Sequence, residues 1–294
     1  MEAELVTGVK RDIALLERVQ ARPGDVVTVL DLSLDRNRAP LLALLARGVR
    51  VRYFDHHYAG GTLPSHPGLE AVIDTSGDTC TSLLVDRHLQ GRFRPWAVVA
   101  AFGDNLAETA RRLGAPLVDG VADLDKLCEL GESLNYNAYG ESEADLLIAP
   151  AALYRMLARY EDPLRFLACE DLGACLSAQR RADLGAALAV APRRTDDRHA
   201  AYLLPSTPWS RRVIGEFANH LARERPQRAY AVLAPRTTGG YIVSVRAPAG
   251  SASGADAFCR QFSTGGGRRE AAGIDHLPAE RLEEFLERFG RAFP

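Results

Sequence analysis

The chain has 294 residues, of which 47% are hydrophobic and 25% are charged, a balance typical of a folded globular protein rather than a disordered or fibrous one. Lys and Arg total 36 against 38 Asp and Glu, and the resulting net charge of -2 excludes a general electrostatic attraction to nucleic acid or anionic membranes. The length predicts two domains, because single hydrophobic cores rarely grow beyond about 250–300 residues.

Cysteine usage and the N-terminal sequence bear on the compartment. The five cysteines include no CxxC pair and predict reduced thiols rather than a disulfide framework or a zinc site. The first residues, MEAELVTGVKRD, lack the features of a secretory signal, and no apolar stretch is long enough to span a membrane. We therefore expect a cytoplasmic protein with no membrane partner. The oligomeric state stays open, a homodimer included.

Strand and helix patterns alternate in the first part of the chain. The β-branched run at residues 26–34 and the apolar segment at 49–54 are predicted strands. Between them, residues 39–47 are a predicted helix closed by Gly48. This β-α-β order predicts parallel strands covered by helices, with ligand-binding residues at the carboxyl ends of the strands.

Helical patterns dominate the middle of the chain. Asp78 and Thr79 have the residue types of a helix cap, and residues 96–102 form an apolar segment that ends just before Asp104. Apolar residues three and four positions apart predict several helices. The predicted helices cover residues 81–89, 123–136 and 150–170.

A second α/β pattern follows a charged stretch at residues 191–199, and we expect a domain boundary near residue 195. This pattern consists of strands and one long amphipathic helix. The predicted strands are residues 200–205, 228–235 and 241–248, and the helix is 209–224.

Residues that can bind a metal follow the predicted strands of the first part. Asp31 ends the apolar part of one strand, and Asp55-His56-His57 directly follows the next. Neighbouring parallel strands lie about 4.8 Å apart, so Asp31 and the histidines could reach one ion. A carboxylate beside imidazoles suits Mn, Fe, Co or Zn. We expect Asp104 to join them at the carboxyl ends of parallel strands.

A glycine-rich motif, TGGGRREAAG, occupies residues 264–273. Three consecutive glycines let backbone N–H groups approach an anion, and the small residues after them predict a helix whose N-terminus points at it. Arg268 at the end of this loop can fork two phosphate oxygens. A bare run of glycines would be more typical of a flexible connection, but the Arg and the AAG that follow favour a phosphate site.

The two motifs lie about 210 residues apart and together resemble the DHH phosphoesterase superfamily with its DHH-associated C-terminal domain, whose usual signature is GGGHxxAAG. The resemblance covers nearly the whole chain. It implies an α/β fold in which residues 1–150 form a parallel-sheet, metal-binding DHH domain. A helical connector at 151–195 would lead to a smaller α/β substrate-binding domain at 196–294. Members are exonucleases, oligoribonucleases, nucleotide phosphatases and cyclic-dinucleotide phosphodiesterases, typically with two Mn ions.

The resemblance also implies roles for single residues. Asp31 would bridge two metals, while His56 and Asp104 would bind one of them and His57 would lie beside the scissile phosphate. The catalytic set implied is thus Asp31, His56, His57 and Asp104, and the metal ligands are Asp31, His56 and Asp104. The substrate-binding set implied is His57, Arg246, Gly265, Gly266, Gly267 and Arg268.

Two features depart from the family pattern. Arg268 replaces the usual histidine, which keeps a cationic donor but removes a group that titrates near neutrality. Family members also open with a strand that ends in an Asp/His-rich loop and supplies most ligands of the other metal. Nothing like it precedes residues 5–8, which resemble the second strand. Either the true start lies upstream, which the presence of the other ligand positions favours, or the chain is a variant with an incomplete site.

The function implied is a Mn-dependent hydrolase of a small nucleotide or short oligonucleotide phosphate ester, with one Mn in this chain and reduced activity. The alternative is a catalytically impaired DHH-fold protein that binds nucleotides or nucleic acid. A third interpretation, a structural domain whose Asp-His-His is incidental, requires two independent motif coincidences. The mildly acidic balance favours short single-stranded substrates over long strands.

Overall fold

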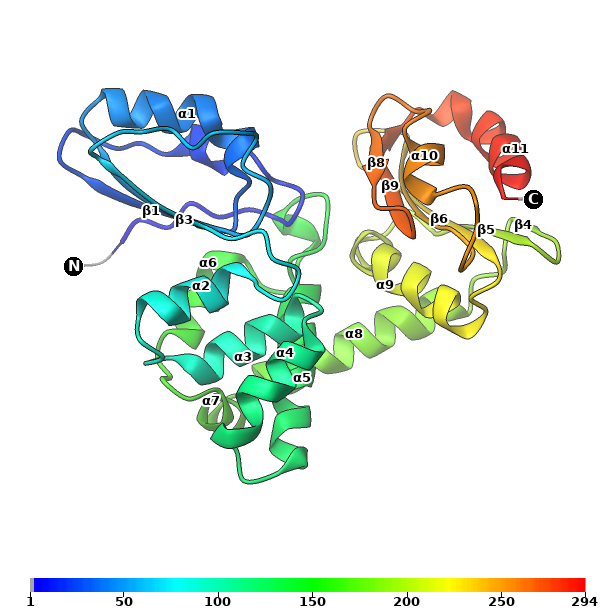
Figure 1. Ribbon diagram of the computed structural model, residues 1–294. Helices are drawn as coiled ribbons and strands as arrows, with labels where there is room; N and C mark the ends of the chain where they lie inside the picture. Colours follow the sequence, from blue (N-terminus) through cyan, green and yellow to red (C-terminus); the bar gives the residue numbers. More distant parts are fainter. Residues whose placement is uncertain (1–2, 294) are drawn as a thin grey trace. The chain divides into compact units, whose positions relative to one another are not determined.

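The computed structural model describes residues 3–293 and contains two compact units (Figure 1). One unit is Met1–Ala138 with Leu147–Ser177, and the other is Tyr139–Leu146 with Ala178–Pro294. The chain passes from the first unit to the second within the long helix α8 (Leu172–Leu188), upstream of residue 195. All five cysteines are free. Within the described part of the chain, no helix is long and apolar enough to cross a bilayer.

The first unit contains a parallel sheet of three strands in the order β1-β2-β3. The strands are β1 (Val26–Leu30), β2 (Arg50–Asp55) and β3 (Leu69–Ile73). Helix α1 (Leu34–Ala46) covers one face, where its leucines pack against Val29, Val51 and Tyr53 (Figure 1). The parallel β-α-β arrangement therefore agrees with the sequence pattern. Residues 5–8, in contrast, belong to neither sheet, so the strand expected there is wrong.

The rest of the first unit is helical. Its helices are α2 (Thr81–His88), α3 (Arg94–Gly103), α4 (Ala107–Gly114), α5 (Val121–Tyr136), α6 (Pro150–Leu157) and α7 (Pro163–Cys169). Helix α3 contains the apolar segment that precedes Asp104, so this residue ends a helix rather than a strand. A short apolar run cannot be assigned by periodicity alone, whereas a proline in the first turn favours a helix. The N-cap of α2 is Cys80, not Asp78 or Thr79.

The second unit is a six-stranded sheet in the order β4-β5-β6-β7-β9-β8, in which β5 and β6 are parallel and the other pairs antiparallel. Its strands are β4 (Arg194–Thr195), β5 (His199–Leu203), β6 (Ala229–Pro235), β7 (Tyr241–Arg246), β8 (Gly265–Gly267) and β9 (Ala271–Leu277). Helix α9 (Pro208–Glu224) packs on β6 and β7, while α10 (Ala255–Cys259) and α11 (Leu282–Ala292) contribute phenylalanines to the core on the opposite face (Figure 1).

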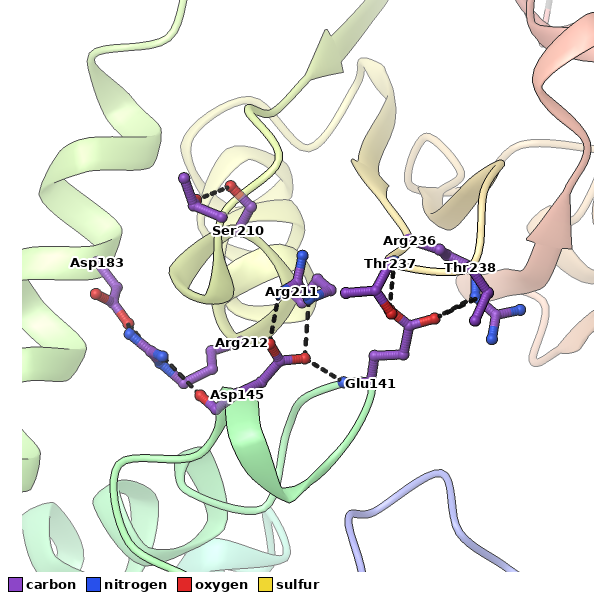
Figure 2. A network of polar contacts seen from close by, with 10 residues as sticks. Glu141, Asp145, Asp183, Ser210, Arg211, Arg212, Arg236, Thr237 and Thr238 are labelled. Atoms are coloured by element: carbon purple, nitrogen blue, oxygen red, sulfur yellow. Dashed lines mark hydrogen bonds and ion pairs between the residues drawn. The ribbon is translucent and has the colours of Figure 1, made fainter.

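Residues 139–146 are held in the second unit by a network of ion pairs (Figure 2). Asp145 accepts two hydrogen bonds from Arg211 of α9, at 2.8 Å from Nε and 2.5 Å from Nη2. Glu141 accepts from the Arg236 side chain and from the Thr237 amide. The Asp145 and Arg211 side chains are only 4% and 6% exposed, so this ion pair is an internal one.

Candidate metal centre and glycine-rich hairpin

Asp31 directly follows β1 and has an unusual backbone conformation. Its φ of 61° lies in the left-handed region, which non-glycine residues seldom occupy. Its amide still donates to the Phe54 carbonyl, so the ladder with β2 continues through this residue. Its carboxylate accepts a 2.6 Å hydrogen bond from Thr81 Oγ1 at the start of α2. The side chain is nevertheless 60% exposed, and the carboxylate is accessible to a ligand.

The two histidines follow the end of β2 and are oriented through their Nδ1 atoms. His56 Nδ1 lies 3.2 Å from the Thr79 carbonyl oxygen, which can only accept, so Nδ1 carries the proton. Nε2 of His56, on the opposite side of the ring, is then the nitrogen that remains for a metal ion. His57 Nδ1 lies 2.7 Å from Oδ1 of the fully buried Asp55. Each ring therefore directs Nε2 away from its Nδ1 partner.

The four predicted catalytic residues lie close together. His56 Nε2 lies 3.4 Å from an Asp31 oxygen and 3.7 Å from an Asp104 oxygen. Ligand atoms of Asp31, His56 and His57 all lie within 4.8 Å of one another. Two ligands that share an ion at about 2.1 Å stand roughly 3.0–3.4 Å apart. The spacing of these nitrogen and carboxylate donors therefore fits a divalent metal ion.

The electrostatics of the cluster agree with this interpretation. Burial raises the pKa of Asp104, and the neighbouring Asp31 carboxylate raises it further. The hydrogen bond to Asp55 raises the pKa of His57 against the opposing effect of burial. Negative charge is therefore concentrated at this edge of the sheet. Such a concentration of oxygen and nitrogen ligands is stabilised by a bound cation.

Several residues around the cluster were missed by the motif analysis. Asp55 and Thr81 orient His57 and Asp31, and Lys10 donates to Asn135 at 2.9 Å. Lys10 and Asn135 also line a pocket of about 480 Å³ that includes Asp31 and Asp104 and continues over apolar side chains. The first Asp of Asp55-His56-His57 could have been recognised from its place at the strand end, but Lys10 and Asn135 belong to no motif.

The glycine-rich motif forms a β-hairpin, and the helix expected after it is wrong. Strand β8 pairs with β9, so that residues 271–273, expected to begin a helix, lie in a strand. A Cβ on Gly265 would lie 1.7 Å from the Cys259 carbonyl oxygen, and one on Gly267 would lie 2.5 Å from Ala272 Cα. A Cβ on Gly266 would meet nothing within 4 Å. Two of the three glycines are therefore required by close backbone approach.

The two arginines predicted to bind substrate differ in their surroundings. Arg246, the last residue of β7, pairs with Ala271 of β9 and is hydrogen-bonded through its side chain. Arg268, in the turn between β8 and β9, is exposed, and only its backbone amide makes a described hydrogen bond, to the Ala271 carbonyl. Arg246 and the glycine-rich hairpin thus lie together at one end of the β7-β9-β8 ladder.

Alanine substitutions should separate the three glycines. We expect Gly265→Ala to lower the free energy of unfolding of the second unit by about 1–3 kcal/mol or more, because the Cys259 backbone cannot move aside cheaply. The matched Gly266→Ala substitution should have little effect, since its Cβ would occupy open space. Urea denaturation of both variants measures the difference, and equal stability would show that close approach at Gly265 is unimportant.

No protein-family model matches the chain, and a search of curated proteins also gives no match. Comparison with solved structures shows that the fold is similar to that of the nuclease RecJ. The chain is similar to RecJ from Thermus thermophilus in complex with Mn²⁺, with a TM-score of 0.58 and 21% identity over 92% of this chain and 45% of RecJ. For the Mg²⁺ complex of the same RecJ the TM-score is 0.55 and the identity is 18%, and the alignment covers 99% of this chain and 54% of RecJ. The chain therefore spans about half the length of RecJ.

A pGpG-specific phosphodiesterase, PggH from Vibrio cholerae, aligns over 91% of this chain and 99% of its own length, with a TM-score of 0.44 and 11% identity. That similarity is too weak to support a functional argument. The RecJ similarity establishes the fold, while the roles of individual residues depend on the local geometry described above.

Proposed function

We propose that this protein is a divalent-metal-dependent phosphoesterase that hydrolyses a phosphate ester of a small nucleotide or short single-stranded oligonucleotide. One observation carries the proposal: Nε2 of His56 faces carboxylate oxygens of Asp31 and Asp104 at 3.4 and 3.7 Å, so an imidazole and two carboxylates converge at one place. The fold shared with RecJ, which has been solved with Mn²⁺ and with Mg²⁺, supports a divalent ion.

In this proposal Asp31, His56 and Asp104 hold the ion, and Mn²⁺ suits their mixed oxygen and nitrogen donors. A bound divalent ion would polarise the phosphoryl oxygen and lower the pKa of a coordinated water. His57 is fixed by its hydrogen bond to Asp55 and offers its other ring nitrogen to the substrate phosphate. Thr81 keeps the Asp31 carboxylate in one orientation by donating to it.

The second unit is proposed to bind the substrate. Arg246 and Arg268 offer cationic donors, and a guanidinium can bind two phosphate oxygens at once. Gly266 leaves open space above the hairpin, where a ligand can approach the backbone. A guanidinium suits phosphate binding rather than proton exchange, so we assign Arg268 to substrate binding and not to acid-base chemistry.

A second candidate function is nucleotide or nucleic-acid binding without turnover. The observation that favours it is that, among residues 3–293, a single group of potential metal ligands is brought together. A displacement that uses two ions places one near the attacking oxygen and one near the leaving oxygen. We therefore expect slow hydrolysis from the chain as it stands.

Metal titration by calorimetry, paired with a hydrolysis assay, tests both candidates. We expect about one Mn²⁺ per chain and slow, Mn²⁺-dependent release of product from a panel of dinucleotides, nucleotide bisphosphates, cyclic dinucleotides and single-stranded DNA. Binding of one ion with no turnover on any substrate would favour the binding protein. Absence of tight Mn²⁺ binding would contradict the metal site itself, and two tight ions would reveal ligands outside the cluster.

A further inference from the structure

Arg246 is held by neutral acceptors from two elements of the second unit. Its Nε donates to Asn219 Oδ1 of α9 at 2.8 Å, and its Nη1 donates to Ser244 Oγ and the Val245 carbonyl, both at 2.9 Å. Its Nη2 donates to the Gly215 carbonyl at 3.2 Å. These contacts use four of the five N–H donors of a guanidinium. The remaining donor, on Nη2, has no acceptor among the described residues.

The charge of this guanidinium is not neutralised by the protein. Within residues 3–293, no carboxylate forms an ion pair with Arg246, although the chain pairs many of its other arginines. Burial lowers the pKa of Arg246 to about 10, the direction expected when a cation is desolvated without a counter-ion. Placing an unpaired cation in a desolvated position is unfavourable in the free protein. Such an arrangement is compensated when an anionic ligand binds.

We propose that Asn219 is a positioning residue: it fixes the Arg246 guanidinium through a neutral oxygen, so that the full charge stays available to a phosphate group of the ligand. An aspartate has nearly the same shape and would make a shorter, stronger contact with Nε. It would also neutralise the guanidinium. The Asn219 amide therefore orients the Arg246 guanidinium without compensating its positive charge. The Ser244 hydroxyl does the same at Nη1. The choice of a phosphate ligand rests on the proposed function, whereas the neutral contacts do not.

The test is the binding of 5′-AMP to the full chain in buffer containing EDTA, measured by calorimetry together with thermal unfolding. In Asn219→Asp we expect affinity for 5′-AMP to fall about ten- to a hundredfold, the value of a charge-assisted phosphate contact, while the melting temperature is unchanged or higher. If Asn219 had a purely structural role, Asn219→Asp would give the same melting temperature but would leave the affinity for 5′-AMP unchanged. Gln20→Glu, at an exposed position of the first unit, adds the same charge and should leave binding unchanged.

A double-mutant cycle shows whether Asn219 acts through Arg246. Arg246→Gln should weaken 5′-AMP binding by a similar factor, and the Asn219→Asp change should add little in that background. Ser244→Ala, which removes one neutral acceptor without adding charge, should cost only a few-fold and serves if Asn219→Asp fails to fold. Three results would each overturn the inference. The parent chain and Asn219→Asp could bind 5′-AMP with equal affinity, the effects of Asn219→Asp and Arg246→Gln on affinity could be fully additive, or the parent chain could fail to bind 5′-AMP. The binding assay is run without metal. A finding that the chain does not hydrolyse phosphate esters would therefore contradict the proposed function but not the role of Asn219.

Discussion

Replacing His56 by alanine is expected to abolish Mn²⁺ binding and any Mn²⁺-dependent hydrolysis. The Nε2 atom lies 3.4 Å from an Asp31 oxygen and 3.7 Å from an Asp104 oxygen, so its removal opens the centre of the ligand set. Loss of the ion removes several kcal/mol of transition-state stabilisation, and each 1.36 kcal/mol corresponds to about tenfold in rate. We therefore expect a fall in rate of about a thousandfold or more, measured by calorimetry and the substrate assay.

The matched control is His66→Ala. His66 is exposed, and its Nδ1 accepts a hydrogen bond from the nearby Gly68 amide. This variant should bind Mn²⁺ with the parent affinity. If His56→Ala retained the parent metal affinity, the ligand set would have to exclude this nitrogen, and the proposed metal site would be wrong.

Replacing Arg211 by methionine is expected to give the largest loss of stability. Methionine keeps much of the packing volume but leaves the Asp145 carboxylate buried without its cation (Figure 2). Breaking a buried ion pair by removing one partner typically costs about 3–5 kcal/mol. Hydrogen exchange of α9 and β6 in increasing urea reports the free energy of unfolding of this unit. Adding Asp145→Asn to the same variant should recover part of the loss, because an amide is cheaper to bury.

The pH dependence gives this prediction a sign. Burial raises the pKa of Asp145, but hydrogen bonds from Arg211 and the Glu141 amide lower it more, so the folded-state pKa lies below the ordinary value. The ionised Asp145 therefore contributes fully to the free energy of unfolding above about pH 4, which is near its pKa in the unfolded chain. This contribution is lost as the pH falls through its pKa in the folded protein. In Arg211→Met, burial without the cation should raise that pKa. The difference in free energy of unfolding between the parent chain and Arg211→Met should therefore be largest near pH 7 and should decrease as the pH is lowered.

Arg281→Met is the control for this experiment. Arg281 pairs with Glu284 through two 2.8 Å hydrogen bonds, but both side chains are substantially exposed. Solvent screening makes such pairs weak, so the free energy of unfolding should hardly change. Arg211→Met could lower the free energy of unfolding as little as the control does, or by an amount that does not depend on pH. Either result would show that the Asp145 pair adds little to the stability of the unit.

The sequence alone was sufficient for the parallel β-α-β start and the antiparallel strands β6 and β7. Alternation in β2, where Arg50 and Arg52 face outward and Val51 and Tyr53 face inward, is a local property of the chain. The convergence of Asp31 and His56 also follows from local order, because parallel neighbouring strands bring their carboxyl ends to one edge. Asp104 was expected to follow a strand, but it follows helix α3 and comes close to His56 only in the packed unit.

Other features were decided by tertiary structure. The glycine motif is a hairpin because β8 finds β9 as a partner and because Gly265 lies against the Cys259 backbone, a contact between segments with no local signal. The assignment of residues 139–146 to the second unit depends on Arg211 and Arg236, which lie 66 and 95 positions from their partners Asp145 and Glu141. The neutral surroundings of Arg246 likewise require α9 and β7 together. A sequence pattern reports which faces are apolar, whereas the pairing of polar groups across long separations is set by the packed chain.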